Sequence, residues 1–399
     1  MIYVHVPFCR SFCTYCDFYS EVAARCRNAE DAVRQESLFE RYADALAAEI
    51  RARKNEIQGT CAGSGVRTLY IGGGTPSVLP LGVFRRMLDA LKEAGVSGEF
   101  TEFTVEVNPE DIVDKGEEYV KELMELGVNR FSMGVQSFDD GILKWMNRRH
   151  DSATAVKAYG ILESAGVGNI SIDLIFGLPQ ISDELWRETL KKALGISSGG
   201  ILPKHISSYQ LSVEPGSMLA KMVDRGMWSE AADELCERQY GILCEELSKA
   251  GYHHYEISNF AQPGYQAVHN SAYWRHVPYV GLGPGAHSYE EVRMESGETG
   301  CFRRWNEGDL EGYLKAAEAG DFSVISGGES LDAEQIGLEK VMLGLRTSAG
   351  LPESLLHDYC GEMAEKALES GDLVVLPDRY VRIPEDRFFV SDSIVASLV

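Results

Sequence analysis

The sequence of 399 residues predicts an α/β protein with a small C-terminal α+β domain. Three observations lead to this prediction. Short β-rich runs alternate with longer amphipathic stretches through the first half of the chain, and the alternation stops after residue 300. Apolar residues make up 44% of the chain, enough for one large core and a smaller second one. The α/β part is therefore either an open (β/α)6 barrel or a doubly wound parallel sheet.

Strands are predicted from short runs rich in β-branched and aromatic residues, at 2–6, 68–71, 103–107, 131–135, 170–176 and 205–211. Helices are predicted between them from amphipathic patterns, at 38–52, 81–94, 117–126, 152–165 and 183–194. Strands joined by helical crossovers pair in parallel. Because both candidate folds are built from such units, the periodicity does not choose between them.

The last quarter of the chain has a different pattern. A polar stretch at 304–319 has helical periodicity, so residues 301–329 are predicted to form a helical connector after an α/β part at 1–300. Residues 330–399 are predicted to form the small domain, with elements at 331–345, 353–370, 374–381 and 388–399. Two helices, a hairpin and a final helix in this order resemble a winged helix, but the net charge of −23 argues against DNA binding.

The composition and the first residues of the chain indicate the cellular compartment and the class of binding partner. The chain begins with a strand-like segment instead of the apolar stretch of a signal peptide, and its nine cysteines are an odd number. We expect a cytoplasmic protein with reduced thiols. No window approaches about 18 consecutive apolar residues, so we expect no membrane span. The net charge of −23 disfavours nucleic acid as a partner, because Lys and Arg bind the phosphate backbone.

Three of the cysteines, Cys9, Cys13 and Cys16, lie close together after the first predicted strand. Thiolates are soft ligands suited to iron–sulfur clusters or zinc. A structural zinc site normally needs four protein ligands, and a local fourth is missing because Asp17 follows Cys16. Three packed free cysteines are the remaining alternative, and their local density argues against it. We therefore predict a [4Fe-4S] cluster with one open iron.

The CxxxCxxC spacing, with Tyr15 before the last cysteine, resembles the radical S-adenosylmethionine (SAM) superfamily. In that superfamily the amino and carboxylate groups of SAM chelate the open iron. Electron transfer then cleaves the sulfonium to a 5'-deoxyadenosyl radical. The resemblance implies that SAM is the second cofactor of this chain.

Segments at the ends of the predicted strands carry a narrower resemblance. They are GGGTP at 72–76, VEVNP at 105–109, GVQSF at 134–138, NRR at 147–149 and IDL at 172–174. Alone, each is explained by a tight turn or by a hydrogen-bonded cap. Together they resemble the oxygen-independent coproporphyrinogen oxidase family over nearly the whole chain. The resemblance implies a partial open (β/α)6 barrel of radical SAM type with extra strands, in place of the doubly wound sheet.

The same resemblance implies a SAM pocket at the carboxyl ends of the strands. Gly73, Gly74 and Thr75 would contact the methionyl part of SAM, and Asp173 would bond its ribose hydroxyls. The other residues implied to line the pocket or to pack near it are Tyr3, Tyr15, Glu106, Gln136 and Arg148.

Two functions remain within this family. One is oxidative decarboxylation of coproporphyrinogen III, and the other belongs to the HemW-type heme chaperones, which bind heme as cargo and transfer it to an acceptor protein. The decarboxylases have a fourth cysteine where this chain has Phe18, and an extension before the first strand where only eight residues precede Cys9. Both differences favour the chaperone over the enzyme. Cleavage of SAM during function is left open.

The segment 269–274 (HNSAYW) fits the HNxxYW pattern of the chaperone branch. His269 offers an imidazole to heme iron, while Tyr273 and Trp274 would cover a porphyrin face. The alternative is a core histidine among aromatic residues, and His287 is a second candidate ligand. The sequence does not name the acceptor protein, and a membrane-bound acceptor is compatible with a chain that has no span of its own.

Overall fold

A computed structural model describes residues 1–22, 29–63, 65–96, 98–200, 202–293 and 299–398. Within these residues the main sheet has nine strands in the order β11-β1-β4-β5-β6-β7-β8-β10-β9. Neighbours from β11 to β8 are parallel, whereas β10 is antiparallel to β8 and β9. In chain order the strands are β1 (Ile2–Val6), β4 (Thr68–Gly73), β5 (Glu102–Val107), β6 (Arg130–Gln136), β7 (Ile170–Phe176), β8 (His205–Gln210), β9 (His253–Glu256), β10 (Asn259–Ala261) and β11 (Val280–Leu282).

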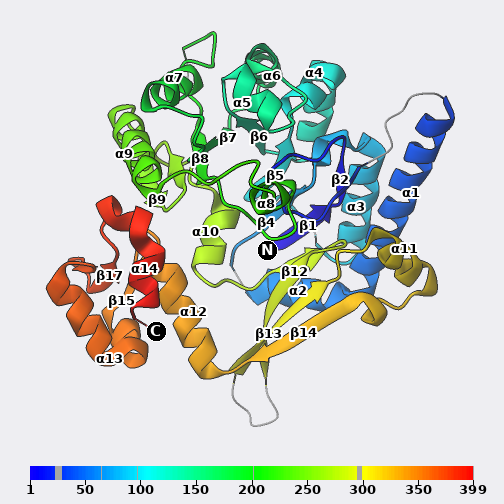
Figure 1. The fold of residues 1–399 in the computed structure, drawn as a ribbon. Helices are drawn as coiled ribbons and strands as arrows, with labels where there is room; N and C mark the ends of the chain where they lie inside the picture. The colour runs from blue at the N-terminus through cyan, green and yellow to red at the C-terminus, as the bar shows by residue number, and fades with distance from the viewer. Residues whose placement is uncertain (23–28, 64, 97, 201, 294–298, 399) are drawn as a thin grey trace.

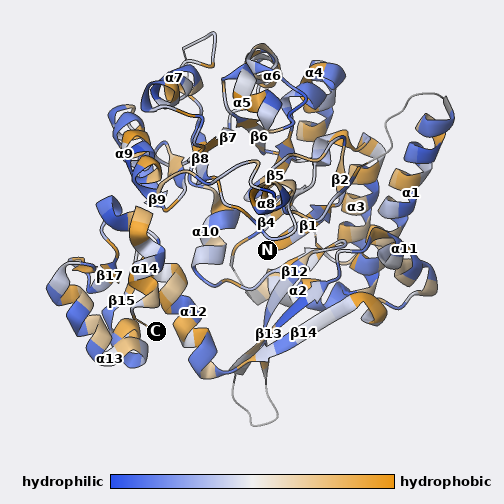
Figure 2. Ribbon diagram, in the orientation of Figure 1, coloured by the Kyte–Doolittle hydropathy of each residue, from blue (hydrophilic) through white to orange (hydrophobic). Residues whose placement is uncertain are grey.

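Helices cover the outer face of this sheet (Figure 1). They are α1 (Ala29–Ala52), α3 (Leu81–Glu93), α4 (Pro109–Glu125), α6 (Ser152–Ser164), α7 (Asp183–Leu194) and α9 (Asp233–Lys249). Figure 2 shows apolar and polar stretches on each of these helices, as expected for helices with one buried side. The strands between them are almost continuously buried, because helices cover one face and the barrel interior encloses the other.

The prediction of an open α/β barrel with extra strands is confirmed. Each predicted strand is present within about two residues of its expected bounds. The sheet does not close on itself, because β11 and β9 form its two edges. The extra strands are β9, β10 and β11, and they widen the sheet on both sides of the six predicted strands.

Two helices begin earlier than the sequence predicts. The helix α1 begins at Ala29 instead of residue 38, and α4 begins at Pro109 instead of residue 117. A proline is favourable in the first turn, where its missing N–H has no helical partner. Gly116 interrupts α4 with φ 75° and ψ −174°, so the predicted helix corresponds to the segment after this glycine.

A second sheet occupies part of the predicted connector. The strands β12 (His287–Arg293), β13 (Thr299–Asn306) and β14 (Ser326–Leu331) pair antiparallel and flank the helix α11 (Leu310–Ala319). The prediction of a helical connector at 301–329 therefore holds for α11 only, since the residues on either side of it form strands. Consecutive charged residues, Arg303 and Arg304, conceal the alternation of β13 because they lie on opposite faces of the sheet.

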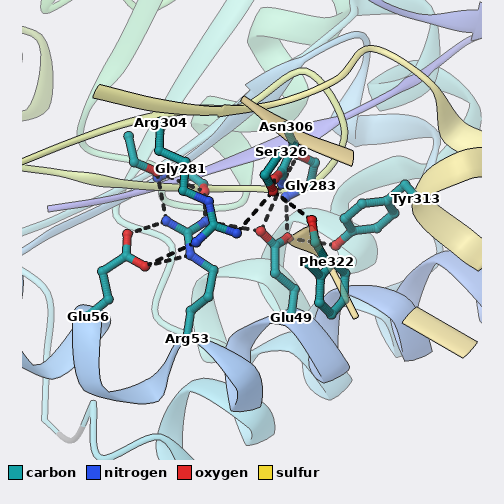
Figure 3. Close-up of polar contacts among 11 residues, drawn as sticks. Glu49, Arg53, Glu56, Gly281, Gly283, Arg304, Asn306, Tyr313, Phe322 and Ser326 are labelled. Atoms are coloured by element: carbon teal, nitrogen blue, oxygen red, sulfur yellow. Dashed lines mark hydrogen bonds and ion pairs between the residues drawn. The ribbon is translucent and has the colours of Figure 1, made fainter. Parts of the chain in front are cut away.

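A buried polar network fastens this second sheet to the end of α1 (Figure 3). Arg53 donates to Glu49 Oε1 at 3.0 Å, to the carbonyl of Gly281 at 2.6 Å and to Ser288 Oγ at 2.8 Å. The amide of Asn306 donates to Glu49 Oε1 at 2.8 Å. Because buried charges are stable only when they are paired and hydrogen-bonded, the network holds β11, β12 and β13 in one arrangement.

The C-terminal part contains the predicted order of elements. They are α12 (Ala333–Leu345), β15 (Leu351–Pro352), α13 (Glu353–Ser370), β16 (Val374–Val375), β17 (Tyr380–Arg382) and α14 (Ser391–Ala396). The three strands form a small antiparallel sheet, and α14 is shorter than the predicted final helix because a 3₁₀ turn over Glu385–Val390 precedes it. The boundaries of the three predicted segments stay a prediction. None of the helices in the described ranges is long and apolar enough to span a bilayer.

Candidate functional site

A cavity of about 390 Å³ opens at the carboxyl ends of the barrel strands. Its wall combines the loop after β1 with the ends of β4 to β8, since parallel strands bring their carboxyl ends together. The predicted site residues that line this cavity are Cys9, Cys13, Tyr15, Cys16, Gly73, Gly74, Thr75, Glu106, Gln136, Arg148 and Asp173. Those that do not line it are Tyr3, His269, Tyr273 and Trp274.

The three predicted cluster ligands are free, partly exposed thiols at the mouth of the cavity. Cys9 Sγ lies 3.4 Å from Thr75 Oγ1, and a guanidinium N–H of Arg148 donates to Cys13 Sγ at 3.5 Å. Burial raises the pKa of Cys9, and burial with the neighbouring thiols raises the pKa of Cys16 to about 12. Iron would reverse this effect, because a bound cation stabilises thiolate. Among the described residues, no group of three or more His, Cys, Asp or Glu side chains is placed so that it could hold a single metal ion.

The loop that carries these cysteines is fixed by contacts with the end of α5 (Asp140–Trp145). The backbone N–H of Thr14 donates to the carbonyl of Met146 at 3.1 Å, and its hydroxyl donates to the carbonyl of Trp145 at 2.8 Å. The amide of Asn147 donates to the carbonyl of Phe12 at 2.7 Å. The loop therefore has a defined position that does not depend on its thiols.

The glycine run after β4 has a role within the protein itself. Gly73 has φ 100°, and a Cβ there would lie 2.6 Å from the ring of His5. A Cβ on Gly74 would lie 2.7 Å from the carbonyl oxygen of Phe8. The Gly74 and Thr75 N–H groups donate to the carbonyls of Val6 and Phe8 at 2.8 and 2.7 Å. Only glycine lets the two loops approach this closely, and the same turn lines the cavity.

Two carboxyl groups stand inside the barrel below the thiols. Tyr70 donates to Glu106 Oε1 at 2.7 Å, and Ser132 donates to Asp173 Oδ1 at 3.3 Å. Burial raises the pKa of both carboxyls; the pKa of Glu106 reaches about 7, partly because Asp173 is close. Carboxyls that are costly to ionise in this cavity favour a ligand with positive charge and hydroxyl groups. SAM has both features.

Gln136 and Arg148 shape the opposite wall. Gln136 ends β6 in the left-handed region at φ 67°, where the register with β7 shifts. A non-glycine residue is held there only when its surroundings determine it, which is common at ligand sites. Arg148 donates to Asn108 Oδ1 at 2.7 Å and to the carbonyl of Gly134 at 2.8 Å. These bonds orient its guanidinium beside Cys13 in the cavity wall.

The two predicted tyrosines occupy different places. Tyr15 lines the cavity and is half-buried near Cys13 and Arg148, and desolvation raises the pKa of its hydroxyl well above the ordinary value. Tyr3 lies behind the wall, where its hydroxyl pairs with His5 Nδ1 at 3.0 Å and its ring lies 6.2 Å from that of Tyr70. Tyr3 therefore supports residues of the wall and does not form the wall itself.

Comparisons with known proteins decide the family. Residues 3–193 match the family model of the radical SAM superfamily. The heme chaperone HemW of Synechocystis sp. is 34% identical over 383 residues, which cover 94% of this chain and 84% of that protein. The heme chaperone HemW of Mycobacterium tuberculosis is 31% identical over 398 residues, which cover 100% of this chain and 94% of that protein. This chain belongs to the HemW family of radical SAM proteins.

The barrel of this HemW family member is similar to a solved structure of a related enzyme. Coproporphyrinogen III oxidase (HemN) from Escherichia coli superposes with a TM-score of 0.76 at 21% identity, covering 100% of this chain and 89% of that chain. This likeness concerns the fold. The resemblance to the radical SAM superfamily and to its heme chaperone branch is confirmed, and the superfamily implies a [4Fe-4S] cluster and SAM.

The segment HNSAYW, typical of the HemW family, forms the helix α10 (Val268–Trp274) inside the amino-terminal end of the barrel. Glu102, the first residue of β5, accepts the N–H groups of Val268 and His269 at 2.7 and 3.0 Å. Asn270, one residue further along, lines the cavity. The helix therefore closes the barrel beneath the cavity and forms its floor.

Both ring nitrogens of His269 are engaged within the protein. Nδ1 pairs with Thr68 Oγ1 at 2.7 Å and Nε2 with the hydroxyl of Tyr273 at 3.0 Å. The residue is 1% exposed, and burial lowers the pKa of its imidazole to about 3. The heme role of His269, Tyr273 and Trp274 stays a prediction, and ligation by His269 would require one of these hydrogen bonds to break.

Sequence reasoning missed several polar residues of the cavity wall, among them Arg130, Ser132 and Asn270. Arg130 is fully buried, and its Nε and Nη1 have no hydrogen-bond partner among the residues described. Arg130 begins β6, where a charged residue is ordinarily taken for the solvated start of a strand. Asn270 is part of the HNxxYW pattern, which was interpreted as a heme site. Membership of this sequence pattern therefore did not reveal that Asn270 lines the cavity at the carboxyl ends of the strands.

Proposed function

We propose that this chain is a heme chaperone that binds a [4Fe-4S] cluster and SAM and transfers heme to an acceptor protein. The observation that carries the cofactor part is the convergence of Cys9, Cys13 and Cys16 on a cavity that also contains Glu106 and Asp173. The cargo part rests on the heme chaperones that are 31–34% identical over nearly the whole chain. The acceptor is a protein, and the net charge of −23 disfavours nucleic acid as a partner.

In this proposal Cys9, Cys13 and Cys16 hold the cluster. Gly73, Gly74 and Thr75 hold the methionyl part of SAM, and Asp173 holds its ribose. When bound, these cofactors supply one-electron chemistry. The remaining groups position SAM and exclude water from it, and they are Tyr3, Tyr15, Glu106, Gln136 and Arg148. The raised pKa of Glu106 falls when a cation enters the cavity, because positive charge favours the carboxylate.

Anaerobic reconstitution with iron and sulfide tests the cofactor part. Wild-type protein should contain one cubane per chain by iron analysis and Mössbauer spectroscopy. Cys13→Ala should lose the cluster, because one of three ligands is gone. The matched control is Cys244→Ala, a cysteine outside the cavity, which should keep full iron content. Full iron content in Cys13→Ala contradicts the assignment.

The alternative function, oxygen-independent coproporphyrinogen III dehydrogenase, is favoured by the fold shared with HemN. Against it, Phe18 stands 64% exposed where the decarboxylases have a cysteine. Decarboxylation requires the propionate within near-attack distance of the radical carbon, and small errors of placement cost large factors in rate. An anaerobic assay with coproporphyrinogen III, cluster, SAM and reductant should give no protoporphyrin, with HemN as the positive control. Multiple turnovers would establish the enzyme and refute the chaperone.

A further inference from the structure

The side chain of Asn108, the residue before α4, departs from the role that its position predicts. Asn108 is the N-cap of this helix, and an asparagine there ordinarily accepts a backbone N–H of the first turn with its side chain. The side chain of Asn108 makes no such bond. The N-cap residues of the three following helices, Asp139, Asp151 and Ser182, all do. The amide of Asn108 is therefore free to bond elsewhere.

This amide lies in the cavity wall and joins two predicted site residues. Its Nδ2 donates to Thr75 Oγ1 at 3.2 Å, and its Oδ1 accepts from Arg148 Nη2 at 2.7 Å. These partners fix the orientation of the amide, because a guanidinium only donates. A carboxylate only accepts, so aspartate at this position does not reproduce both bonds.

Thr75 and Arg148 each continue to one of the predicted cluster ligands. Thr75 Oγ1 lies 3.4 Å from Cys9 Sγ, and Arg148 Nη1 donates to Cys13 Sγ at 3.5 Å. Since the Thr75 oxygen accepts from the amide of Asn108, its own hydrogen can be donated to the sulfur of Cys9. The side chains thus form one hydrogen-bonded arc, which runs from Cys9 through Thr75, Asn108 and Arg148 to Cys13. Each end of the arc places a donor at a thiol.

The centre of the arc is held by contacts that involve no thiol. The backbone N–H of Asn108 donates to Ser77 Oγ at 3.1 Å, and Ser77 donates to Asp111 Oδ2 at 2.8 Å. Asp111 Oδ1 lies 3.2 Å from Nε of Arg10, the residue after Cys9. The position of Asn108 therefore does not depend on how the thiols turn to bind iron.

We propose that Asn108 is a positioning residue that aims one hydrogen-bond donor at each of two cluster ligands and thereby raises the reduction potential of the cluster. The inference rests on the cluster of the proposed function and gives a role to a residue that is not one of its ligands. Hydrogen bonds to the cysteine sulfurs are among the factors that set the potential of an iron–sulfur cluster. They stabilise the negative charge added on reduction, because the hydrogen of the donor carries positive partial charge. Residues that orient the groups around a metal site in this way tune its chemistry without touching the metal.

The test is a redox titration of the reconstituted full chain without SAM, followed by the electron paramagnetic resonance of the reduced cluster. Asn108→Asp keeps the shape of the side chain and loses its donor, whereas Asn108→Leu loses both bonds. Both variants should have a midpoint potential at least about 59 mV more negative than wild type, which is about tenfold in the one-electron equilibrium. The matched control is Asn129→Asp, before the first residue of β6, where the amide oxygen accepts the N–H of Phe103. This control should keep the wild-type potential.

A second set of variants tests whether Asn108 acts through Thr75. Thr75→Val removes the donor at Cys9 and should also make the potential more negative. The double variant Thr75→Val with Asn108→Leu should shift the potential by less than the sum of the two single shifts, because both substitutions remove the same bond. Fully additive shifts would mean that the two residues act independently, and they would overturn the arc.

Each other outcome has a distinct meaning. Wild-type potentials in both Asn108 variants, with full iron content, would overturn the inference and leave the cluster and the chaperone function standing. A merely structural role of Asn108 would give this result together with a lower free energy of unfolding. Loss of the cluster from a folded Asn108→Asp protein would also overturn the inference, because it gives Asn108 no part in ligation. Absence of a cubane from the wild-type chain would refute the cofactor part of the proposed function itself.

Discussion

Replacing His269 by alanine tests whether α10 stabilises the barrel and builds the floor of the cavity. The substitution removes two neutral hydrogen bonds, to Thr68 and Tyr273, each worth about 1 kcal/mol. It leaves the buried Thr68 hydroxyl without its partner at a cost of about 1–3 kcal/mol, and it opens a space in the core. We expect the free energy of unfolding to fall by about 3–5 kcal/mol.

The same variant should weaken SAM binding through Tyr70. The rings of His269 and Tyr70 are 5.1 Å apart, and the hydroxyl of Tyr70 donates to Glu106 at 2.7 Å. Without the imidazole the tyrosine ring loses its support, so the carboxyl loses its fixed position. Loss of one hydrogen bond to a charged group costs about 1.5–3 kcal/mol, which is roughly tenfold or more in affinity.

Urea denaturation measures the first effect, and anaerobic calorimetric titration of the cluster-loaded chain with SAM measures the second. Iron content should stay at the wild-type level, because α10 supplies none of the three predicted cluster ligands. Thr68→Val removes only the bond to Nδ1 and should cost about 1–2 kcal/mol of stability. A folded His269→Ala protein with wild-type stability and wild-type SAM affinity would refute the role of α10.

Three further substitutions give independent tests. Asp173→Ala should weaken SAM binding by about 1.5–3 kcal/mol in the same titration without changing iron content, and unaltered affinity would remove this residue from the site. Arg53→Met should lower the free energy of unfolding by about 3–5 kcal/mol in urea, because Glu49 is left buried without its cation. Burial raises the pKa of Glu256 from 4.5 to about 7, so the folded chain keeps a proton that the unfolded chain loses, and this group lowers stability as the pH rises from about 4.5 to 7. The free energy of unfolding of Glu256→Gln, measured relative to wild type by urea denaturation, should therefore increase by about 3 kcal/mol between pH 5 and pH 8. A difference that stays constant over this pH range would contradict the raised pKa of Glu256.

The barrel strands and much of the cavity could be predicted because their signals are local. A run such as 170–176 is apolar, β-branched and short, which specifies a buried strand without knowledge of its neighbours. Since such strands are parallel, the polar residues at their carboxyl ends had to converge. Glu106, Gln136 and Asp173 line the same cavity for this reason.

Features that depend on distant contacts could not be predicted. The strand β13 is specified by its pairing with β12 and β14. Local sequence patterns instead predict a solvent-exposed segment there, because two arginines are adjacent. Arg130 lines the cavity only because the barrel surrounds it. The two heme candidates, His269 and His287, are equal as residues of a sequence. Their difference is that Thr68 and Tyr273 engage one imidazole, while the other lies open beside an indole.

The cysteine loop illustrates how the fold prepares a cofactor site before any cofactor binds. Backbone groups of Val6 and Phe8 hold the glycine turn after β4, and Thr14 is held on both sides, by Met146 and by the N–H of Leu219 at 2.8 Å. These contacts fix the loop without using a thiol. A ligand set ordered in advance loses little conformational entropy on binding, so more of the metal–sulfur interaction appears as affinity. Because these contacts involve backbone groups, substitution of a cysteine should remove the cluster while leaving the loop and the SAM cavity in place.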